Sequence, residues 1–346
     1  MGCDATDFLV GFHSLNQIFK RGEKSMKRIL SALVSLAVIL ATLSGCSSKP
    51  TDIRILCIEN SPASVITDMI TNNDTGKSGV NYVISTVNLA SRVQSLMLDD
   101  ECDVAILPIE TAQAIYRKKS VSIQVLAGIS VGGFELITSE NISALSEIKG
   151  KEIFLTERGT LMEKIFKHLI KLNGLNPNED ITLNYASDAT QLSNQFAKKE
   201  VSFALVKSED AALVKAQNEY INSYNITDEL SKKLKKPSIV TYCVIAKKDF
   251  IESNQKEIDV MITDIQNSVT SVKDDRKKAG KSAKEQNLIT LDVDTEILLN
   301  EFKPDFIAGE DMQKKFTAYF NFLTNVDSSL SEKSIPDDSF YYIPEE

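Results

Sequence analysis

Short apolar runs alternate with amphipathic stretches along the chain from residue 52 onward. Continuous apolar runs are typical of β-strands buried on both faces, whereas apolar positions repeating every three to four residues are typical of helices. In the first half this pattern predicts strands at residues 53–58, 81–87, 104–107 and 123–127. It predicts helices that begin at Ser61, with Pro62 in the first helical position, and that cover 88–98 and 111–117. The β-α-β-α-β order indicates an α/β layer fold with a parallel sheet.

The pattern repeats at an offset of 99 residues. Residues 93–112 align without gaps on residues 192–211, and Glu110 falls on Glu209. In both stretches a helix ends in charged residues, and a buried strand, a polar turn and an alanine follow. The repeat predicts two similar α/β lobes with mainly parallel sheets.

Two stretches of the chain are candidates for the connections between the lobes. Residues 131–134 contain the pair Gly132-Gly133, and glycines permit unusual backbone dihedrals. Residues 235–238 form the second connection, after which the pattern predicts a strand at 239–246, helices at 255–272, 294–301 and 310–323, and an extended segment at 336–342. We therefore expect lobe I to comprise residues 52–131 and 239–346, and lobe II residues 132–238. Two crossovers make a hinge, with a ligand cleft between the lobes.

The start of the chain has the composition of a bacterial lipoprotein signal peptide. Lys27 and Arg28 precede an apolar run of about fifteen residues, which is shorter than the roughly 20 that a membrane-spanning helix needs. The run ends in Leu43-Ser44-Gly45-Cys46, which matches a lipobox, and a polar tether reaches residue 51. We expect 26–45 to be the signal peptide, Cys46 to carry the lipid, and residues 1–25 to be an upstream mis-start. A short buried helix followed by an incidental cysteine is the alternative reading.

Charge and rare residues exclude several classes of function. Residues 1–45 carry five basic and three acidic side chains, so residues 46–346 carry a net charge of −11. Binding to nucleic acid needs clustered cations, which this balance argues against. With His13 in the leader and His168 in an amphipathic run, a His-based metal site or a Ser-His-Asp triad is not expected. Three cysteines sit in or next to strand-like stretches and are expected to be buried thiols: Cys57, Cys102 and Cys243.

The chain resembles the substrate-binding components of ABC importers for nitrate, taurine, aliphatic sulfonates and thiamine-precursor pyrimidines, which have the type II periplasmic-binding-protein fold. The similarity spans about residues 52–340. The matching segments are residues 53–55 leading to 61–63, 102–107, 148–153 leading to 158–160, 172–175 and 244–252. The chain differs from the family in having no Trp, and in having Asn60-Ser61 where several members have a Pro-rich turn.

The lipobox implies a protein anchored to the outer face of the cell membrane through a lipid on Cys46. The resemblance adds a role in transport. It implies a monomer without a cofactor or metal, whose partners are a small-molecule ligand and the permease and ATPase subunits of an ABC importer. A ligand-sensing role with a separate membrane signalling partner is an alternative. An enzyme on the same fold is a weaker one, because the related fungal pyrimidine synthases consume an active-site histidine and His168 lies in a helix pattern.

The candidate ligand residues lie in the turns that connect strands to helices. Ligands of open α/β sheets bind beyond the carboxyl ends of the strands, where helix N-termini offer free N–H groups. The candidates are Asn60, Ser61, Asn88, Glu110, Thr111, Arg158, Gly159, Thr160, Asp188, Thr190 and Glu209. For each Ser, Thr or Asn, plain helix capping is the alternative role.

The sequence is compatible with an anionic ligand and with a cationic one. Arg158 could clamp a carboxylate or a sulfonate with two hydrogen bonds, or it could form a surface ion pair with Glu157 or a neighbour. Against an anion stand four acidic residues in the same turns, which favour a cation or an amine-bearing heterocycle: Glu59, Glu110, Asp188 and Glu209. In either case we expect hinge closure to bury the ligand between the lobes.

Overall fold

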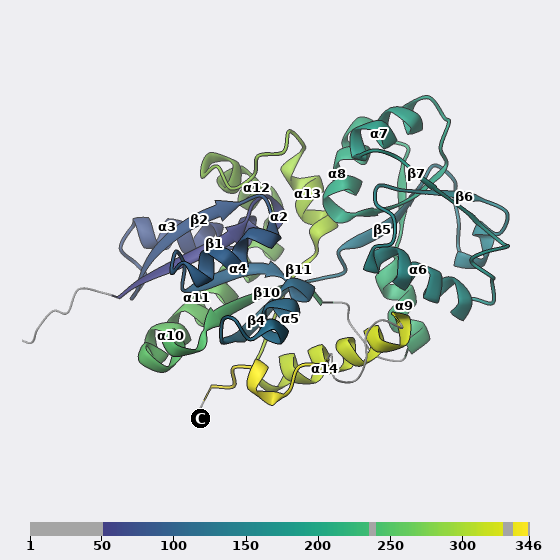
Figure 1. Cartoon of the computed structure of the whole chain (residues 1–346). Helices are drawn as coiled ribbons and strands as arrows, with labels where there is room; N and C mark the ends of the chain where they lie inside the picture. The colour runs from purple at the N-terminus through teal and green to yellow at the C-terminus, as the bar shows by residue number, and fades with distance from the viewer. Residues whose placement is uncertain (1–50, 235–239, 328–334, 345–346) are drawn as a thin grey trace, which may run out of the picture. The chain divides into compact units, whose positions relative to one another are not determined.

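The computed structural model describes residues 51–234, 240–327 and 335–344 (Figure 1). The predicted extension, signal peptide, Cys46 and nearly all of the tether lie outside the described residues, as does the predicted connection at 235–238. Within the described ranges, we find no helix with the length and apolar character needed to cross a membrane.

The described strands form two sheets. The first has six strands in the order β11-β4-β10-β3-β1-β2, and we call the unit around it lobe I. Its strands are β1 (Asp52–Ile58), β2 (Asn81–Val87), β3 (Val104–Pro108), β4 (Ile123–Val131), β10 (Val240–Lys247) and β11 (Pro304–Ala308). The second sheet has five strands in the order β7-β6-β8-β5-β9, and we call the unit around it lobe II. Its strands are β5 (Phe134–Thr138), β6 (Glu152–Leu155), β7 (Thr182–Tyr185), β8 (Phe203–Lys207) and β9 (Asn222–Tyr224).

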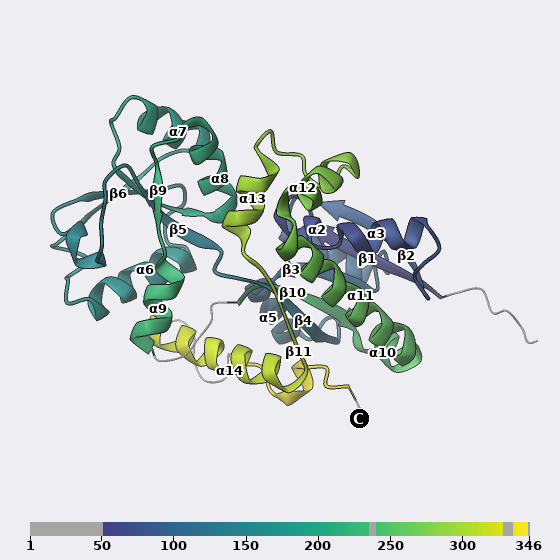
Figure 2. The ribbon, with the colours of Figure 1, turned by 180° about the vertical axis from the view of Figure 1, so that it is seen from behind.

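Helices flank both sheets (Figures 1 and 2). Those of lobe I are α2 (Ser61–Ser64), α3 (Thr67–Asp74), α4 (Val93–Leu98), α5 (Ile109–Lys118), α10 (Lys248–Ser253), α11 (Gln255–Asp274), α12 (Arg276–Glu285), α13 (Thr295–Phe302) and α14 (Gly309–Val326). Those of lobe II are α6 (Leu161–Leu172), α7 (Ala189–Ala197), α8 (Ser208–Gln217) and α9 (Ile226–Leu234).

The two-lobe α/β fold is confirmed, but the sheets are mixed rather than mainly parallel. In lobe I, β1 pairs in parallel with β2 and β3, whereas β10 lies between β3 and β4 and is antiparallel to both. In lobe II, β6 pairs in parallel with β7 and β8, and β5 is antiparallel to β8. Strands β10 and β5 are each the first strand after a connection between the lobes, so each enters its sheet from the opposite end; β11, at the edge of the first sheet, is antiparallel to β4 as well.

The repeat at an offset of 99 residues corresponds to equivalent elements of the two lobes. Strand β3 and helix α5 have the same lengths as β8 and α8, and each of their boundaries is shifted by that offset. The order β2-β1-β3-β10 in lobe I matches β7-β6-β8-β5 in lobe II. Glu110 and Glu209 therefore occupy equivalent positions, in the first turns of α5 and α8.

Sheet A, the sheet of lobe I, is buried on both faces, which explains its continuous apolar runs. Ile53 and Ile55 of β1 pack in one core cluster with the apolar residues of α11. Leu56 and Ile58 point to the other face and pack in a cluster that includes residues of α5 and α14. The three cysteines of the strand regions are free and buried, as expected.

Several predicted boundaries need correction. Asn60 rather than Ser61 is the N-cap residue of α2, and it makes no side-chain cap bond. The helix expected at 88–98 is a 3₁₀ turn at Ala90–Arg92 followed by α4, so Asn88 caps nothing. Helix α5 starts two residues earlier than expected, because Pro108 ends β3 and serves as the N-cap residue. The segment at 336–342 is not wholly extended, since residues Asp338–Phe340 form a 3₁₀ turn.

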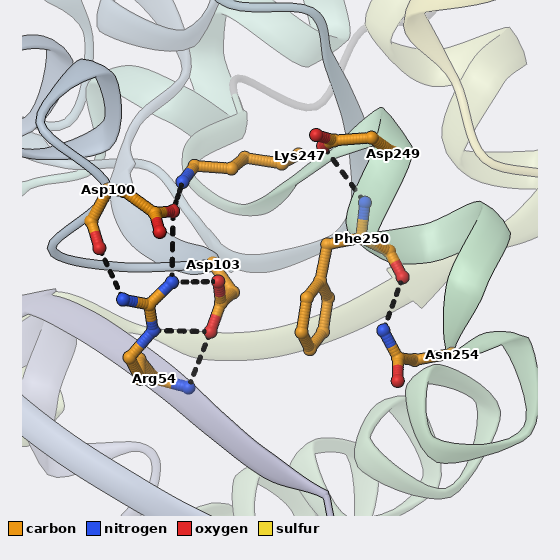
Figure 3. A network of polar contacts seen from close by, with 7 residues as sticks. All are labelled: Arg54, Asp100, Asp103, Lys247, Asp249, Phe250 and Asn254. Carbon is orange, nitrogen blue, oxygen red and sulfur yellow. Dashed lines mark hydrogen bonds and ion pairs between the residues drawn. The ribbon is translucent and has the colours of Figure 1, made fainter.

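An ion-pair network ties together the strand ends at one edge of sheet A (Figure 3). Arg54 donates from Nε to Asp103 Oδ2 over 2.9 Å and from Nη2 to Asp103 Oδ1 over 2.5 Å. The backbone amide of Arg54 also donates to Asp103 Oδ2, over 3.1 Å. Asp100 extends the network, because its Oδ1 accepts from Arg54 Nη2 over 3.0 Å and from Lys247 Nζ over 2.6 Å. The network thereby links β1, β10 and the loop before β3.

The connection between β4 and β5 depends on glycine at position 133. Gly133 has a φ of +94°, and a Cβ placed there would lie 2.2 Å from Thr241 Cγ2. Thr241 has little freedom to turn away, because its hydroxyl lies 2.7 Å from the Ser130 hydroxyl. Only glycine therefore fits where the chain passes from lobe I to lobe II.

Replacing Gly133 with Ala is expected to lower the free energy of unfolding by about 2–4 kcal/mol, because a left-handed backbone and a side-chain clash add together. Gly174→Ala is the matched control: φ there is +78°, and a Cβ would meet nothing within 4 Å. The control should lose only about 1 kcal/mol. Urea unfolding of both variants measures the difference, and equal losses would contradict the proposed clash with Thr241.

Candidate functional site

Glu110 lies partly buried in the first turn of α5, beyond the end of β3. The hydroxyl of Tyr319, on α14, donates a hydrogen bond to Glu110 Oε1 over 2.9 Å. Tyr319 is itself only 1% exposed. Burial raises the pKa of Glu110 above its usual range, because a carboxylate loses hydration there, while the bond from Tyr319 acts in the opposite direction. The carboxyl group of Glu110 is therefore poorly hydrated, and its hydrogen-bond partner is the neutral hydroxyl of Tyr319.

Glu209 occupies the equivalent position in α8 and faces the start of α2 in the other lobe. Burial raises the pKa of Glu209, and the backbone amide and hydroxyl of Ser61 lie close enough to lower it in part. Ser61 is fully buried, and its hydroxyl has no partner at hydrogen-bonding geometry among the described residues. The hydroxyl of Ser208, next to Glu209, is likewise buried without a partner there.

The pKa of Tyr242, on β10, responds to both carboxyl groups. Burial raises its pKa first, and the negative charges of Glu209 and Glu110 raise it further. Both carboxyl groups thus act on one phenol, although they come from different lobes. We call this group the interlobe acidic cluster; it consists of Ser61, Glu110, Glu209, Tyr242 and Tyr319.

The two carboxyl groups of the interlobe acidic cluster have no basic partner among the described residues. Within the described ranges, neither Glu110 nor Glu209 forms an ion pair with a Lys or Arg. Lys207 is near enough to lower the pKa of Glu209, but its Nζ is bonded to Glu157 over 2.8 Å. Burial also raises the pKa of the neighbouring Asp210, and the charges of Glu157 and Asp188 add to this. Such a site can accept hydrogen bonds from N–H groups and stabilise a positive charge.

Asn60 has a structural role beside the cluster. Its Oδ1 accepts hydrogen bonds from the backbone amides of Thr290 (2.9 Å) and Leu291 (3.1 Å), and its own amide donates to the Leu288 carbonyl over 2.7 Å. These bonds hold the loop between α12 and α13 against α2. The φ of Asn60 is +70°, an uncommon backbone conformation for a residue other than glycine.

Arg158 lies on the loop between β6 and α6. It is exposed, and its guanidinium carbon lies 4.4 Å from the ring centroid of Tyr185. This cation–π contact replaces the surface ion pair with Glu157, since Glu157 pairs with Lys207.

Helix capping accounts for the other lobe II candidates. Thr160 is the N-cap residue of α6, and its hydroxyl accepts from the Glu163 amide over 3.3 Å. The Gly159 amide donates to Glu163 Oε2 over 2.7 Å. Asp188 is the N-cap residue of α7, and its Oδ1 accepts from the Gln191 amide over 2.7 Å. Thr190 is exposed in the first turn of α7.

Of the candidates, the structure brings Ser61 and Glu209 together, and Glu110 is linked to Glu209 through their shared effect on the pKa of Tyr242. Asn60 and Thr111 are adjacent to these residues in sequence. The exposed Asn88 and the capping residues of lobe II are not part of this group. Tyr242 and Tyr319 were missed by the sequence reasoning. Tyr242 lies on a strand beyond the repeated segment, and Tyr319 reads as an ordinary apolar position of α14, so no local signal marked either.

The histidine and the possible metal ligands of the described residues are the alternatives to the acidic residues. His168 packs on Phe322 of α14, with ring centroids 5.7 Å apart, and burial lowers its pKa. In the ranges that the structure describes, no group of three or more His, Cys, Asp or Glu side chains is arranged to hold a metal ion.

Solved structures share this fold at low sequence identity. An ABC transporter protein from Parabacteroides distasonis matches with a TM-score of 0.67 and 14% identity, over 86% of this chain and 99% of that chain. The periplasmic aliphatic sulphonate binding protein SsuA from Escherichia coli matches with a TM-score of 0.62 and 11% identity, over 86% and 94%. A Candida albicans protein with the generic periplasmic binding protein fold matches with a TM-score of 0.52 and 16% identity, over 84% and 93%.

Comparison of the sequence with curated proteins gives no significant match. The sequence pattern of one family, described as NMT1/THI5 like, matches residues 77–279, which is more than half of the chain. The match runs from just before β2 through lobe II into α12, and so includes Glu110, Glu209 and Tyr242 but not Ser61 or Tyr319. The chain belongs to the NMT1/THI5-like family.

Proposed function

We propose that this chain is an extracytoplasmic solute-binding lipoprotein of an ABC importer. It is anchored to the outer face of the cell membrane through a lipid on Cys46, captures a small organic molecule between its lobes, and delivers it to the permease. The family membership and the fold shared with ABC-transporter binding proteins support the solute-binding role. The lipid anchor rests on the lipobox sequence alone.

One observation carries the ligand-binding proposal. Glu110 and Glu209 are equivalent residues of the two lobes; Tyr242 pairs with Pro108, two residues before Glu110, and both carboxyl groups raise its pKa. Two polar groups that converge from opposite lobes are what a hinged binding protein needs, because a ligand that bridges them stabilises the closed form over the open form. The hydroxyl of Ser208, which is buried without a hydrogen-bond partner among the described residues, is a further group that a ligand could satisfy.

The charge of the site favours a ligand with a positive charge or several N–H donors. SsuA from Escherichia coli is named for binding aliphatic sulphonates, which are anions. An anion placed between Glu110 and Glu209 would be repelled by both carboxylates in a poorly hydrated site. We infer that the ligand is an organic amine or an amine-bearing heterocycle. Ligand contacts by Arg158 and the other lobe II candidates stay predictions.

The same residues give no support for catalysis. The two solved structures from Parabacteroides distasonis and Escherichia coli are described as transporter or binding proteins, and His168 packs its ring against Phe322. We therefore propose binding without chemical change, with no cofactor.

A thermal-shift panel tests the proposal. Polyamines and aminopyrimidines are expected to raise the melting temperature, whereas alkyl sulfonates and carboxylates of matched size are not. A ligand at 100 times its Kd adds about 2.7 kcal/mol to the free energy of unfolding, which shifts the melting temperature by several degrees. No response in any class would contradict the solute-binding proposal, and a response to sulfonates alone would contradict the inferred ligand charge.

A further inference from the structure

Two ion pairs bridge the lobes outside the interlobe acidic cluster. Lys215, in the last turn of α8, donates from Nζ to Glu301 Oε1 of α13 over 2.6 Å, and their side chains are 17% and 12% exposed. Glu135 of β5 accepts a hydrogen bond at Oε1 from Nζ of Lys303, just after α13. In each pair one residue belongs to lobe II and the other to lobe I.

The four side chains form one network. Burial raises the pKa of Glu135, and the charges of Lys303, Glu301 and Lys215 all act on it. The Glu135 side chain is 2% exposed, so its charge depends on these partners rather than on water. We call these four residues the interlobe clasp.

The interlobe clasp lies beside the connection between the lobes. A Cβ placed on Gly132 would lie 3.4 Å from Lys303 Cδ, so the stem of Lys303 passes over the glycine that precedes Gly133. Helix α8 also packs directly against α13, as both ribbon views show (Figures 1 and 2). Any rotation of lobe II about this connection must therefore move Lys215 relative to Glu301.

Helix α8 links the interlobe clasp to the ligand site. Glu209 lies in its first turn and Lys215 in its last turn. A helix of this length moves as a rigid rod, so fixing Lys215 on α13 also fixes the position of Glu209 relative to Ser61. The ion pair of Lys215 thus holds the C-terminal end of α8, and the N-terminal end of the same helix carries Glu209, a candidate ligand-binding residue.

We propose that the interlobe clasp positions Glu209 by holding α8 against α13, and that it sets the balance between open and closed lobes. The expected effect on ligand affinity rests on the proposed solute-binding function. If the lobes are already closed without ligand, the ligand has to supply less free energy to close them. Lys215, Glu301, Glu135 and Lys303 are positioning residues that do not touch the ligand.

The test measures the distance between the lobes without any ligand. Spin labels are attached to Ala197→Cys on α7 and Asn267→Cys on α11, both at exposed positions. Pulsed electron paramagnetic resonance should give a narrow distribution of distances between the two spin labels in the protein that carries no further substitution. Lys215→Met and Glu301→Gln should each broaden the distribution toward longer distances, and the charge swap Lys215→Glu with Glu301→Lys should narrow it again. Lys314→Met removes an exposed ion pair with Glu310 within α14 and should leave the distribution unchanged.

A second measurement connects the interlobe clasp to binding. Lys215→Met and Glu301→Gln should weaken the affinity for the ligand found in the panel by about tenfold each, and the charge swap should recover most of this loss. An unchanged lobe distance in both single variants would overturn the proposal, even if they unfold more easily. If no ligand is found, the proposed solute-binding function is contradicted. The role of the interlobe clasp is still decided in that case, because the distance measurement needs no ligand.

Discussion

Replacing Asp103 with Ala is expected to lower the free energy of unfolding by about 2–4 kcal/mol, the range for breaking a largely buried ion pair. Asp103 is nearly buried, its side chain being 6% exposed. It accepts two hydrogen bonds from the Arg54 guanidinium and one from the Arg54 amide (Figure 3). Without it, the guanidinium loses its bidentate partner, and the amide at the start of β1 loses its acceptor.

Asp100→Asn is the matched control for this prediction. Asp100 belongs to the same network, but its side chain is 76% exposed, so water replaces lost contacts there. Asparagine also tolerates the φ of +57° at this position. Urea unfolding should show a large loss for Asp103→Ala and a much smaller one for Asp100→Asn. Similar losses for the two variants would mean that the buried part of the network contributes little.

Replacing Cys46 with Ser is expected to release the protein from the membrane almost completely. The lipobox Leu43-Ser44-Gly45-Cys46 offers one thiol as the lipid acceptor, and a serine hydroxyl is a much poorer nucleophile at neutral pH. Stable anchoring needs about two acyl chains, so loss of the modified residue removes the whole anchor. Labelled fatty acid should be incorporated into the unchanged protein and not into the variant.

Cys102→Ser controls for a general effect of losing a thiol. Cys102 is buried in lobe I, so its replacement should leave both lipid labelling and the membrane fraction intact. Continued labelling of Cys46→Ser, or its retention in the membrane fraction, would show that this cysteine is not the anchor.

The order of elements in the repeated segments could be predicted because these strands are buried on both faces and the helices between them are amphipathic. Strand β2 has the predicted bounds, and β3 with α5 matches β8 with α8 at the predicted offset. The pairing of β10 could not be predicted in this way. An apolar run indicates a buried strand but not its direction, and the direction of β10 depends on its arrival from the other lobe.

Only part of the candidate site could be predicted. The repeat marked Glu110 and Glu209 as equivalent, and the α/β rule placed them at the ligand end of the sheets. Capping and ligand binding use the same residue types, so Thr160 and Asp188 were indistinguishable from Ser61 in sequence. Tyr319 reaches Glu110 across 209 positions in sequence, and no local pattern reveals such a contact.

The central claim is that a ligand binds between Glu110 and Glu209, and calorimetric titration tests it most directly. The ligand found in the panel is titrated into the unchanged protein, Glu110→Gln, Glu209→Gln and the control Glu310→Gln. Glu310 also lies in the first turn of a helix, but its side chain is 72% exposed and pairs with Lys314. We expect Glu110→Gln and Glu209→Gln each to lower the affinity about 10- to 100-fold, because each removes a charged hydrogen-bond partner of the ligand. The control should bind with unchanged affinity. Unchanged affinity in both Glu110→Gln and Glu209→Gln would contradict the claim.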